Sequence, residues 1–169
     1  PTLAYLPPGS QLVLLARPAE ILKDDEGRLF AKSLGPEVES ALAQVAKFCD
    51  GTLEDIETIQ VGWQAAGEDG VLAGYAVRLV ESKRLPDDEG VRKTLWGDTK
   101  PQKVADETMH VGPAWSFWVP TAGRRRTLVV APEKLLQEII EAGPLPKDET
   151  EIAAILPKEL ELLVGMLDR

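Results

Sequence analysis

The sequence predicts an α+β fold in which helices cover one face of an antiparallel sheet. Two observations predict this class. Apolar and polar residues alternate over 59–65 and again over 71–81, which is typical of two half-buried strands joined as a hairpin. Apolar stripes with helical spacing occur over 36–49 and 132–142. We expect the first six elements to form a βαββαβ, ferredoxin-like core, which a hairpin and a C-terminal helix extend.

The N-terminal part of this core begins with a strand and continues with helices. Residues 11–17 include a continuous apolar run, which is typical of a strand that is central in a sheet or buried on both faces. Pro18 suits the first position of a short helix over 19–23. The helix over 36–49 carries one apolar stripe, formed by Val38, Ala41, Leu42, Val45 and Ala46.

The C-terminal part supplies the elements that follow the hairpin. A short helix is expected over 91–96, and a single polar strand over 100–111. Aromatic and apolar residues then predict strands over 114–120 and 126–131. Pro132 is expected to start the last helix, because proline is tolerated at the first helical position.

Length and charge limit the classes of function. The chain has 169 residues, which fits one domain, and we place that domain at residues 1–155. Its 28 acidic residues outnumber its 19 basic ones and give a net charge of −9, which argues against a nucleic-acid-binding surface. Cys49 is the sole cysteine, so no intrachain disulfide forms and a small buried residue is the favoured interpretation. No stretch approaches the roughly 20 apolar residues that span a bilayer, so we expect no membrane insertion of this segment.

A pattern near the N-terminus recurs near the C-terminus. Residues 6–17 are LPPGSQLVLLAR and residues 156–167 are LPKELELLVGML, so both place an apolar segment after a Leu-Pro pair. We therefore expect residues 156–169 to form a strand. One interpretation makes this strand the start of a second copy of the unit, and the other makes it an edge strand that closes the sheet. In either case it is expected to pair with its own sheet or with another chain, because apolar edges invite association.

Three segments of the chain resemble a group of bacterial proteins. They are the Leu-Pro pattern before the first strand, GTLEDI at 51–56 and RTLVVAP at 126–132. Together they are similar to uncharacterised, repeat-containing, exported or lipid-anchored proteins of the planctomycete type. The resemblance implies an extracytoplasmic setting, either periplasmic or at the cell surface, and it carries over no functional residue. Because the chain begins at Pro1, we also expect a processed protein or a piece of a longer one.

Two acidic segments and one histidine are the candidate metal ligands. The tetrapeptide DDEG at 24–27 recurs at 87–90, and carboxylates beside a glycine can bind calcium. Their spacing differs from that of an EF-hand loop and favours solvated turns or helix starts instead. His110 has no cysteine or histidine at metal-ligand spacing. Since no nucleophile motif or phosphate-binding glycine loop occurs either, we assign no metal, cofactor or catalytic residue and expect no enzymatic activity.

Aromatic residues are the first candidates for a binding surface. Trp63, Tyr75, Trp115 and Trp118 lie in predicted strands and would provide an aromatic patch for a ligand or a partner. Because side chains alternate along a strand, Trp115 and Phe117 share one face and Trp118 points to the other. One of these faces is expected to be core and the other exposed.

Basic residues at 124–126 are the second candidates. They lie at the tip of a predicted hairpin in an otherwise acidic chain. Arg124 and Arg125 are therefore candidate contacts for an anion or an acidic surface. The alternative is that these charges keep a loop tip and its edge soluble.

These observations favour a non-catalytic scaffold or protein-interaction module of a larger exported protein. Its target would be a protein partner or a neighbouring domain of the same polypeptide. The alternative is a small-ligand-binding domain that uses exposed aromatic residues on the open face of the sheet. A third hypothesis is a hydrolase whose carboxylates come together only in space. A scaffold predicts no deep polar cleft, a ligand-binding domain predicts tryptophans together in a concavity, and a hydrolase predicts paired carboxylates with displaced pKa values.

Overall fold

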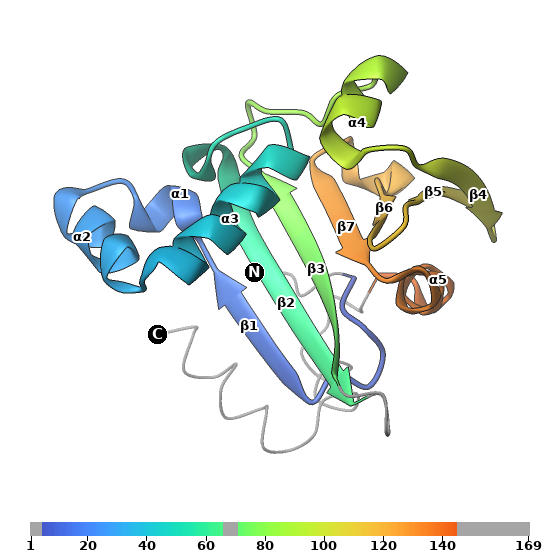
Figure 1. Cartoon of the computed structure of the whole chain (residues 1–169), viewed down its shortest axis with the longest axis horizontal. Coiled ribbons are helices and arrows are strands. Elements are labelled where there is room, and N and C mark those ends of the chain that lie inside the picture. Colours follow the sequence, from blue (N-terminus) through green and yellow to red (C-terminus); the bar gives the residue numbers. More distant parts are fainter. Residues whose placement is uncertain (1–4, 66–70, 145–169) are drawn as a thin grey trace.

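A seven-stranded antiparallel sheet forms the centre of the computed structural model, which describes residues 5–65 and 71–144 (Figure 1). The strands lie in the order β1-β2-β3-β7-β6-β5-β4. They are β1 (Leu12–Ala16), β2 (Ile56–Ala65), β3 (Val71–Leu79), β4 (Lys100–Val104), β5 (Glu107–Val111), β6 (Ser116–Trp118) and β7 (Thr127–Ala131). The helices are α1 (Pro18–Ile21), α2 (Asp25–Ser33), α3 (Pro36–Phe48), α4 (Glu89–Trp96) and α5 (Glu133–Ala142), with single 3-10 turns at η1 (Leu53–Asp55) and η3 (Thr121–Gly123).

The connection between β1 and β2 decides the topology. Helices α1, α2 and α3 separate these strands in sequence, yet the strands are direct antiparallel neighbours, with Leu14 opposite Val61. A βαβ unit would instead make the two strands that flank its helix parallel. The α+β class with an antiparallel sheet is confirmed, whereas the ferredoxin-like βαββαβ order is not.

Helices cover both faces of the sheet, so the prediction of helices on one face is wrong. On one face, α3 and α4 share a hydrophobic core with the sheet, and on the other face α5 does so. We call these faces the α3 side and the α5 side. Strand β7 shows why two covers are needed, because its residues are buried on alternate sides: Leu128 and Val130 on the α3 side, Val129 and Ala131 on the α5 side. A continuous apolar run of this kind requires cover on both faces.

Most of the predicted elements are present close to their expected bounds, including β1, the β2–β3 hairpin, α3, α4, β7 and α5. Helix α2 is an addition to the prediction. Its N-cap is Asp24, whose carboxylate accepts the backbone N–H of Gly27 at 2.8 Å. Asp88 caps α4 in the same way and accepts the N–H of Val91 at 2.9 Å. Both DDEG segments are therefore helix starts, which was the interpretation favoured over calcium binding.

The single strand predicted over 100–111 is wrong, because two strands occupy that range. Strands β4 and β5 form a tight hairpin in which Val104 lies opposite Glu107. Ala105 at the turn has a φ of 51°. Glycine or asparagine usually adopts this left-handed conformation, so an alanine at position 105 did not indicate a hairpin turn.

The Leu-Pro pair that precedes β1 packs onto the centre of the sheet on the α5 side. Gly62 of β2 and Gly74 of β3 lie opposite each other in the sheet, and the ring of Pro7 covers both. A Cβ atom at Gly62 would lie 2.7 Å from Cδ of Pro7, and one at Gly74 would lie 2.9 Å from Cγ of the same ring. The two glycines are therefore required by the close approach of Pro7 rather than by backbone conformation.

We expect Gly62→Ala to lower the free energy of unfolding by about 1–3 kcal/mol, because the new methyl group would overlap the Pro7 ring. Urea unfolding monitored by far-UV circular dichroism measures this change. The Pro7→Ala and Gly62→Ala double variant is the control, because removal of the ring relieves the overlap with Pro7 and leaves the close approach of the new methyl group to Oγ of Ser10, also at 2.7 Å. Additive losses in the double variant would contradict the packing described here.

Two sequence expectations lie outside the described residues. They are the domain boundary at residue 155 and the strand over 156–169. Within residues 5–65 and 71–144, none of the helices combines the length and the apolar character needed to cross a membrane.

Candidate functional site

An apolar groove of about 490 Å³ lies between α3 and the sheet. The helix contributes the stripe predicted from its spacing, including Val38, Leu42 and Val45, and the sheet contributes residues of β1, β2, β3 and β7. Among the described residues that line this groove, Glu37 carries the one charge. Such a lining favours apolar groups and offers few polar atoms to orient a polar small molecule.

Three of the four aromatic candidates line the apolar groove. Trp63, Tyr75 and Trp115 are half-buried there, and the rings of Tyr75 and Trp115 meet edge-on with centroids 5.6 Å apart. Trp118 points to the α5 side, as the predicted alternation required, where it is buried and donates its indole N–H to Glu107 at 3.2 Å. The expected open aromatic face is therefore absent from the described part of the sheet, because α5 covers the side to which Trp118 points.

Most of the exposed apolar side chains belong to the segment from β1 to the start of α3. Seven large apolar side chains are exposed among the described residues, and all but Val91 of α4 belong to β1, to α2 with its C-cap residue, or to the start of α3. Leu29 is 67% exposed, Phe30 is 55% exposed and Leu12 is 51% exposed. We call the set the edge surface, and it consists of Leu12, Leu14, Leu29, Phe30, Leu34 and Val38.

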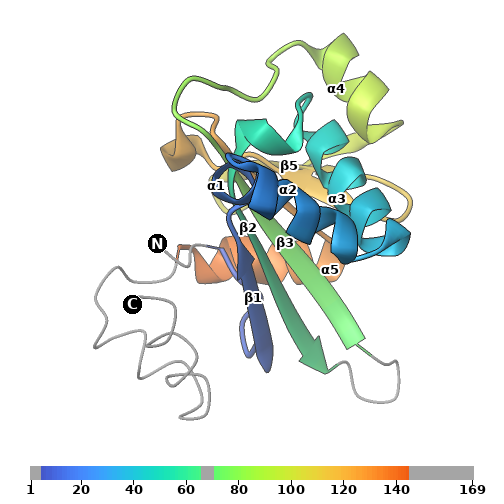
Figure 2. The same ribbon diagram turned by 90° about the vertical axis from the view of Figure 1, so that its left-hand side faces the viewer.

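Helix α2 lies at the surface of the described part of the chain. The helix is amphipathic, yet none of its residues is buried. Figures 1 and 2 show α2 on the α3 side of the sheet and beyond β1, the last strand in the sheet order. Amphipathic helices normally bury their apolar stripe against a neighbouring layer, so the exposure of this stripe is unusual.

The edge surface was not among the residues singled out from the sequence, although β1 carried a signal for it. Residues 12–16 are apolar at every position and contain no charge or proline. Natural edge strands usually contain charged residues or proline, which prevent association with other strands. Because residues 12–16 contain neither, the sequence predicted a central strand. The structure places β1 at the edge instead. Strand β1 therefore combines the sequence of a central strand with an edge position in the described sheet.

The basic candidates lie away from the apolar groove. Arg125 forms an ion pair with Asp87 at 2.7 Å, and its guanidinium donates to the backbone oxygen of Leu85. Asp87 also pairs with Arg92 of α4 at 3.0 Å. Arg124 is exposed and has a left-handed backbone, with a φ of 49°. Arg125 therefore tethers the start of β7 to the segment before α4, and neither arginine contributes to the lining of the groove.

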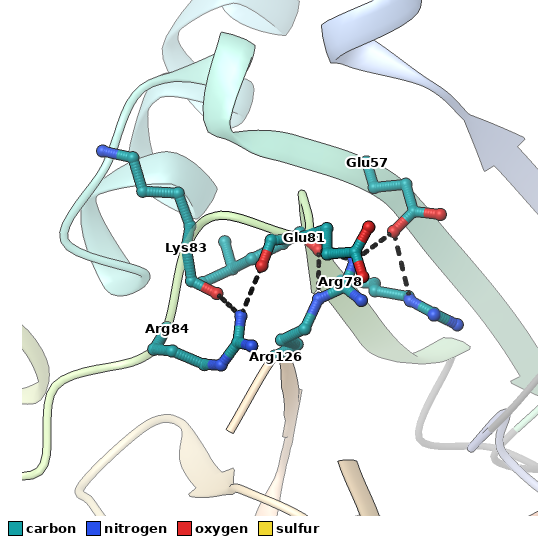
Figure 3. Close-up of polar contacts among 7 residues, drawn as sticks. Glu57, Arg78, Glu81, Lys83, Arg84 and Arg126 are labelled. Atoms are coloured by element: carbon teal, nitrogen blue, oxygen red, sulfur yellow. Dashed lines mark hydrogen bonds and ion pairs between the residues drawn. The ribbon is translucent and has the colours of Figure 1, made fainter. Parts of the chain in front are cut away.

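A second polar cluster closes the end of the sheet at which β2 begins. Arg126 donates to Glu57 at 2.7 Å and to the backbone oxygen of Leu79 at 2.8 Å, and Arg78 pairs with the same carboxylate at 3.2 Å (Figure 3). The side chain of Arg126 is 15% exposed, whereas that of Arg78 is 46% exposed. Arg126 is thus a buried link between β7, β3 and β2, and Arg78 is a surface partner of Glu57.

The titratable groups with displaced pKa values serve packing and capping. Burial raises the pKa of the Cys49 thiol to about 12, so the thiol stays protonated at neutral pH, and the interpretation as a small buried residue is confirmed. The pKa of Asp55 is lowered, first because its carboxylate accepts the backbone N–H of Thr52 at the start of η1. No group of three or more His, Cys, Asp or Glu among the described residues could hold a metal ion. The groove itself contains no carboxylate pair, since Glu37 is its single described acidic residue.

Arg126→Ala is expected to lower the free energy of unfolding by about 1.5–3 kcal/mol, because it removes charge-assisted hydrogen bonds from a largely buried position. Arg78→Ala is the matched control and is expected to cost less than about 1 kcal/mol, because its ion pair is exposed. Chemical denaturation of both variants measures the difference. Equal losses would contradict the roles assigned to the two arginines.

Stability is expected to fall as the pH is lowered from about 7.5 to 5.5. Burial lowers the pKa of His110, and the nearby Arg92 guanidinium lowers it further. The unfolded chain, with a histidine pKa of about 6.5, then binds the proton more readily than the folded protein does, so stability is present above that pH and is lost as the pH falls through the folded pKa. Denaturation of the wild type and of His110→Gln across this range measures the effect, and the variant is expected to show the shallower dependence. An identical dependence in both proteins would show that His110 is not its source.

The chain matches no protein-family model, no curated protein and no solved structure. The resemblance to repeat-containing exported proteins therefore stays a prediction.

Proposed function

We propose that this protein is an interaction module that binds an extended apolar segment of a polypeptide at the β1 edge of its sheet. The observation that carries the proposal is the edge surface, in which the edge strand β1 and the helices that follow it carry six exposed apolar side chains. Addition of a strand to an open edge supplies backbone hydrogen bonds for affinity, and pockets for alternate side chains supply specificity. Both parts are present here, because among residues 5–65 and 71–144 the one strand that pairs with β1 is β2, and the apolar groove is lined by Leu14 and Val38.

The orientation of β1 connects the open edge with the apolar groove. Leu14 and Ala16 line the groove, so every second residue of β1 faces the α3 side. An added strand would continue this pattern, so its alternate side chains would extend the apolar lining that Leu14 and Ala16 contribute on the α3 side. Burial of each large apolar side chain contributes about 1.5–3 kcal/mol, so a short segment gains enough to bind without any polar pocket.

A small apolar ligand is the second candidate occupant. The observation in its favour is that Trp63, Tyr75 and Trp115 line the groove together. A small apolar ligand cannot form backbone hydrogen bonds with the edge of β1, whereas a peptide can. For this reason the peptide is the preferred partner. We further propose, on the resemblance stated above, that the module works in an exported protein and is non-catalytic.

A short peptide of alternating valine and threonine is expected to bind the protein and to shift the backbone amide signals of Leu12–Ala16 and Asp25–Ser33 in nuclear magnetic resonance spectra. Leu14→Lys is expected to weaken binding about ten-fold or more, because it places a charge in the apolar contact. Val91→Lys is the matched control, since Val91 is the exposed apolar residue that lies outside the edge surface, and it should leave binding unchanged.

A peptide of the same sequence in which every backbone nitrogen is methylated separates the two candidate occupants. It keeps the side chains but has no backbone N–H group with which to pair with a strand edge. Loss of binding supports strand addition at β1. Unchanged binding of the methylated peptide would favour capture of apolar groups by the groove alone, and no binding of either peptide would refute the proposed function.

A further inference from the structure

We propose that a polar cavity on the α5 side of the sheet, at the end where β2 begins, binds a carboxylate group between Arg17 and Arg78. The cavity has a volume of about 380 Å³, and Thr58 lines it together with the two arginines. It shares no lining residue with the apolar groove, which lies on the α3 side. The inference is therefore independent of the proposed function.

The three residues form a row across three neighbouring strands. Thr58 of β2 lies opposite Arg78 of β3. The register of β1 with β2, continued by one residue, places Arg17 opposite Thr58 on its other side. Because Ala16 lines the groove on the α3 side, Arg17 points to the α5 side, in agreement with its place in the cavity lining. Neighbouring strands lie about 4.8 Å apart, so the two arginines leave the sheet roughly 10 Å apart and can converge on one group above the threonine.

Both arginines keep hydrogen-bond donors for a ligand. Arg78 contacts Glu57 through Nε at 3.2 Å, which leaves its two terminal nitrogens (Figure 3). Arg17 contacts Glu20 through Nη1 at 3.4 Å, which leaves Nε and Nη2. Neither guanidinium forms another hydrogen bond in the described part of the chain. A carboxylate has two oxygens that accept paired hydrogen bonds from a guanidinium, so it can use the donors of both arginines.

The charges around the cavity favour an anion with a single charge. Arg126 already binds the Glu57 carboxylate at 2.7 Å from a largely buried position, so Arg78 is the second cation on one carboxylate. With Arg17 and Glu20, three arginines face two glutamates, which leaves one positive charge in a chain whose net charge is −9. A carboxylate balances that charge. A phosphate dianion would exceed it and would lie beside the two glutamates.

The rest of the lining fits a small or slender ligand. Ala19 and Val80 add short apolar side chains beside the charged ones. The volume lies in the range of small-molecule sites. The side chains of Arg17 and Arg78 are 42% and 46% exposed, so an anion in solution can reach both. The carboxylate of a short aliphatic acid and the C-terminal carboxylate of a polypeptide share this chemistry.

Titration with sodium butyrate at constant ionic strength tests the site in the full chain. Saturable shifts of the backbone amide signals of Arg17, Thr58 and Arg78 are expected in nuclear magnetic resonance spectra, with a dissociation constant in the millimolar range. Butyramide, which has the same shape without the charge, and inorganic phosphate are expected to bind at least ten-fold more weakly. Equal shifts with butyramide, or tighter binding of phosphate than of butyrate, would overturn the proposal.

Substitution of each arginine provides an independent measurement. Arg78→Gln and Arg17→Gln are each expected to weaken butyrate binding about ten-fold or more, because each removes one of the two guanidinium groups. Arg78→Lys keeps the charge but lacks the paired donors, and it is expected to bind several-fold more weakly than the wild type. Arg124→Gln is the matched control, since it makes the same change of charge at an exposed arginine outside the cavity lining. Equal weakening in Arg124→Gln would show a general effect of charge and would overturn the site.

An N-acetylated tripeptide with a free C-terminal carboxylate separates the two sources of the group. Tighter binding of this peptide than of butyrate, lost when its C-terminus is amidated, would uphold the site and identify a polypeptide end as its ligand. Tighter binding of butyrate would uphold the site and identify a free acid. Absence of binding of both probes would overturn the inference, whereas the proposed function would still depend on the valine–threonine peptide.

Discussion

Burial of the central strands on both faces is the constraint on which the rest of this structure depends. Strand β7 sends alternate residues into the core under α3 and into the core under α5, and Phe117 and Trp118 of β6 do the same. Because the central strands carry apolar residues on both faces, helices must cover both faces of the sheet. The N-terminal helices cover one side, and α5 together with the Leu-Pro segment covers the other.

The cover is complete over the middle of the sheet and incomplete at β1. Helix α3 spans the sheet at a distance that leaves the apolar groove, and α2 continues the helical layer past the last strand. The layer of helices is therefore wider than the layer of strands on this side. This difference in width accounts for the exposed apolar side chains that β1 and α2 carry in the described part of the chain.

Local patterns in the sequence were sufficient for the individual elements and insufficient for their arrangement. The stripe of α3 and the alternation in β2 and β3 identified those elements, because their spacing reports which face is buried. The pairing of β1 with β2 across three helices has no local signal, since it depends on where the chain returns to the sheet. The turn at Ala105 was missed because an alanine occupies a conformation that glycine usually takes. For the candidate site, three of the four aromatic residues chosen from the sequence line the groove, namely Trp63, Tyr75 and Trp115. The fourth, Trp118, lies in the core under α5. Alternation along a strand assigns residues to two faces, but it does not show which face a helix covers.

The strand order also has a consequence for how the chain folds. Strands β2 and β3 are neighbours in sequence and pair along most of their length, so their hairpin forms through local contacts. The pairs β1–β2 and β3–β7 instead join segments that are far apart in the chain, and closing such long loops costs entropy before any pairing is gained. Strand β1 is thus expected to join the sheet at a late, slow stage of folding, and until it pairs with β2 its apolar residues are exposed to other unfolded chains.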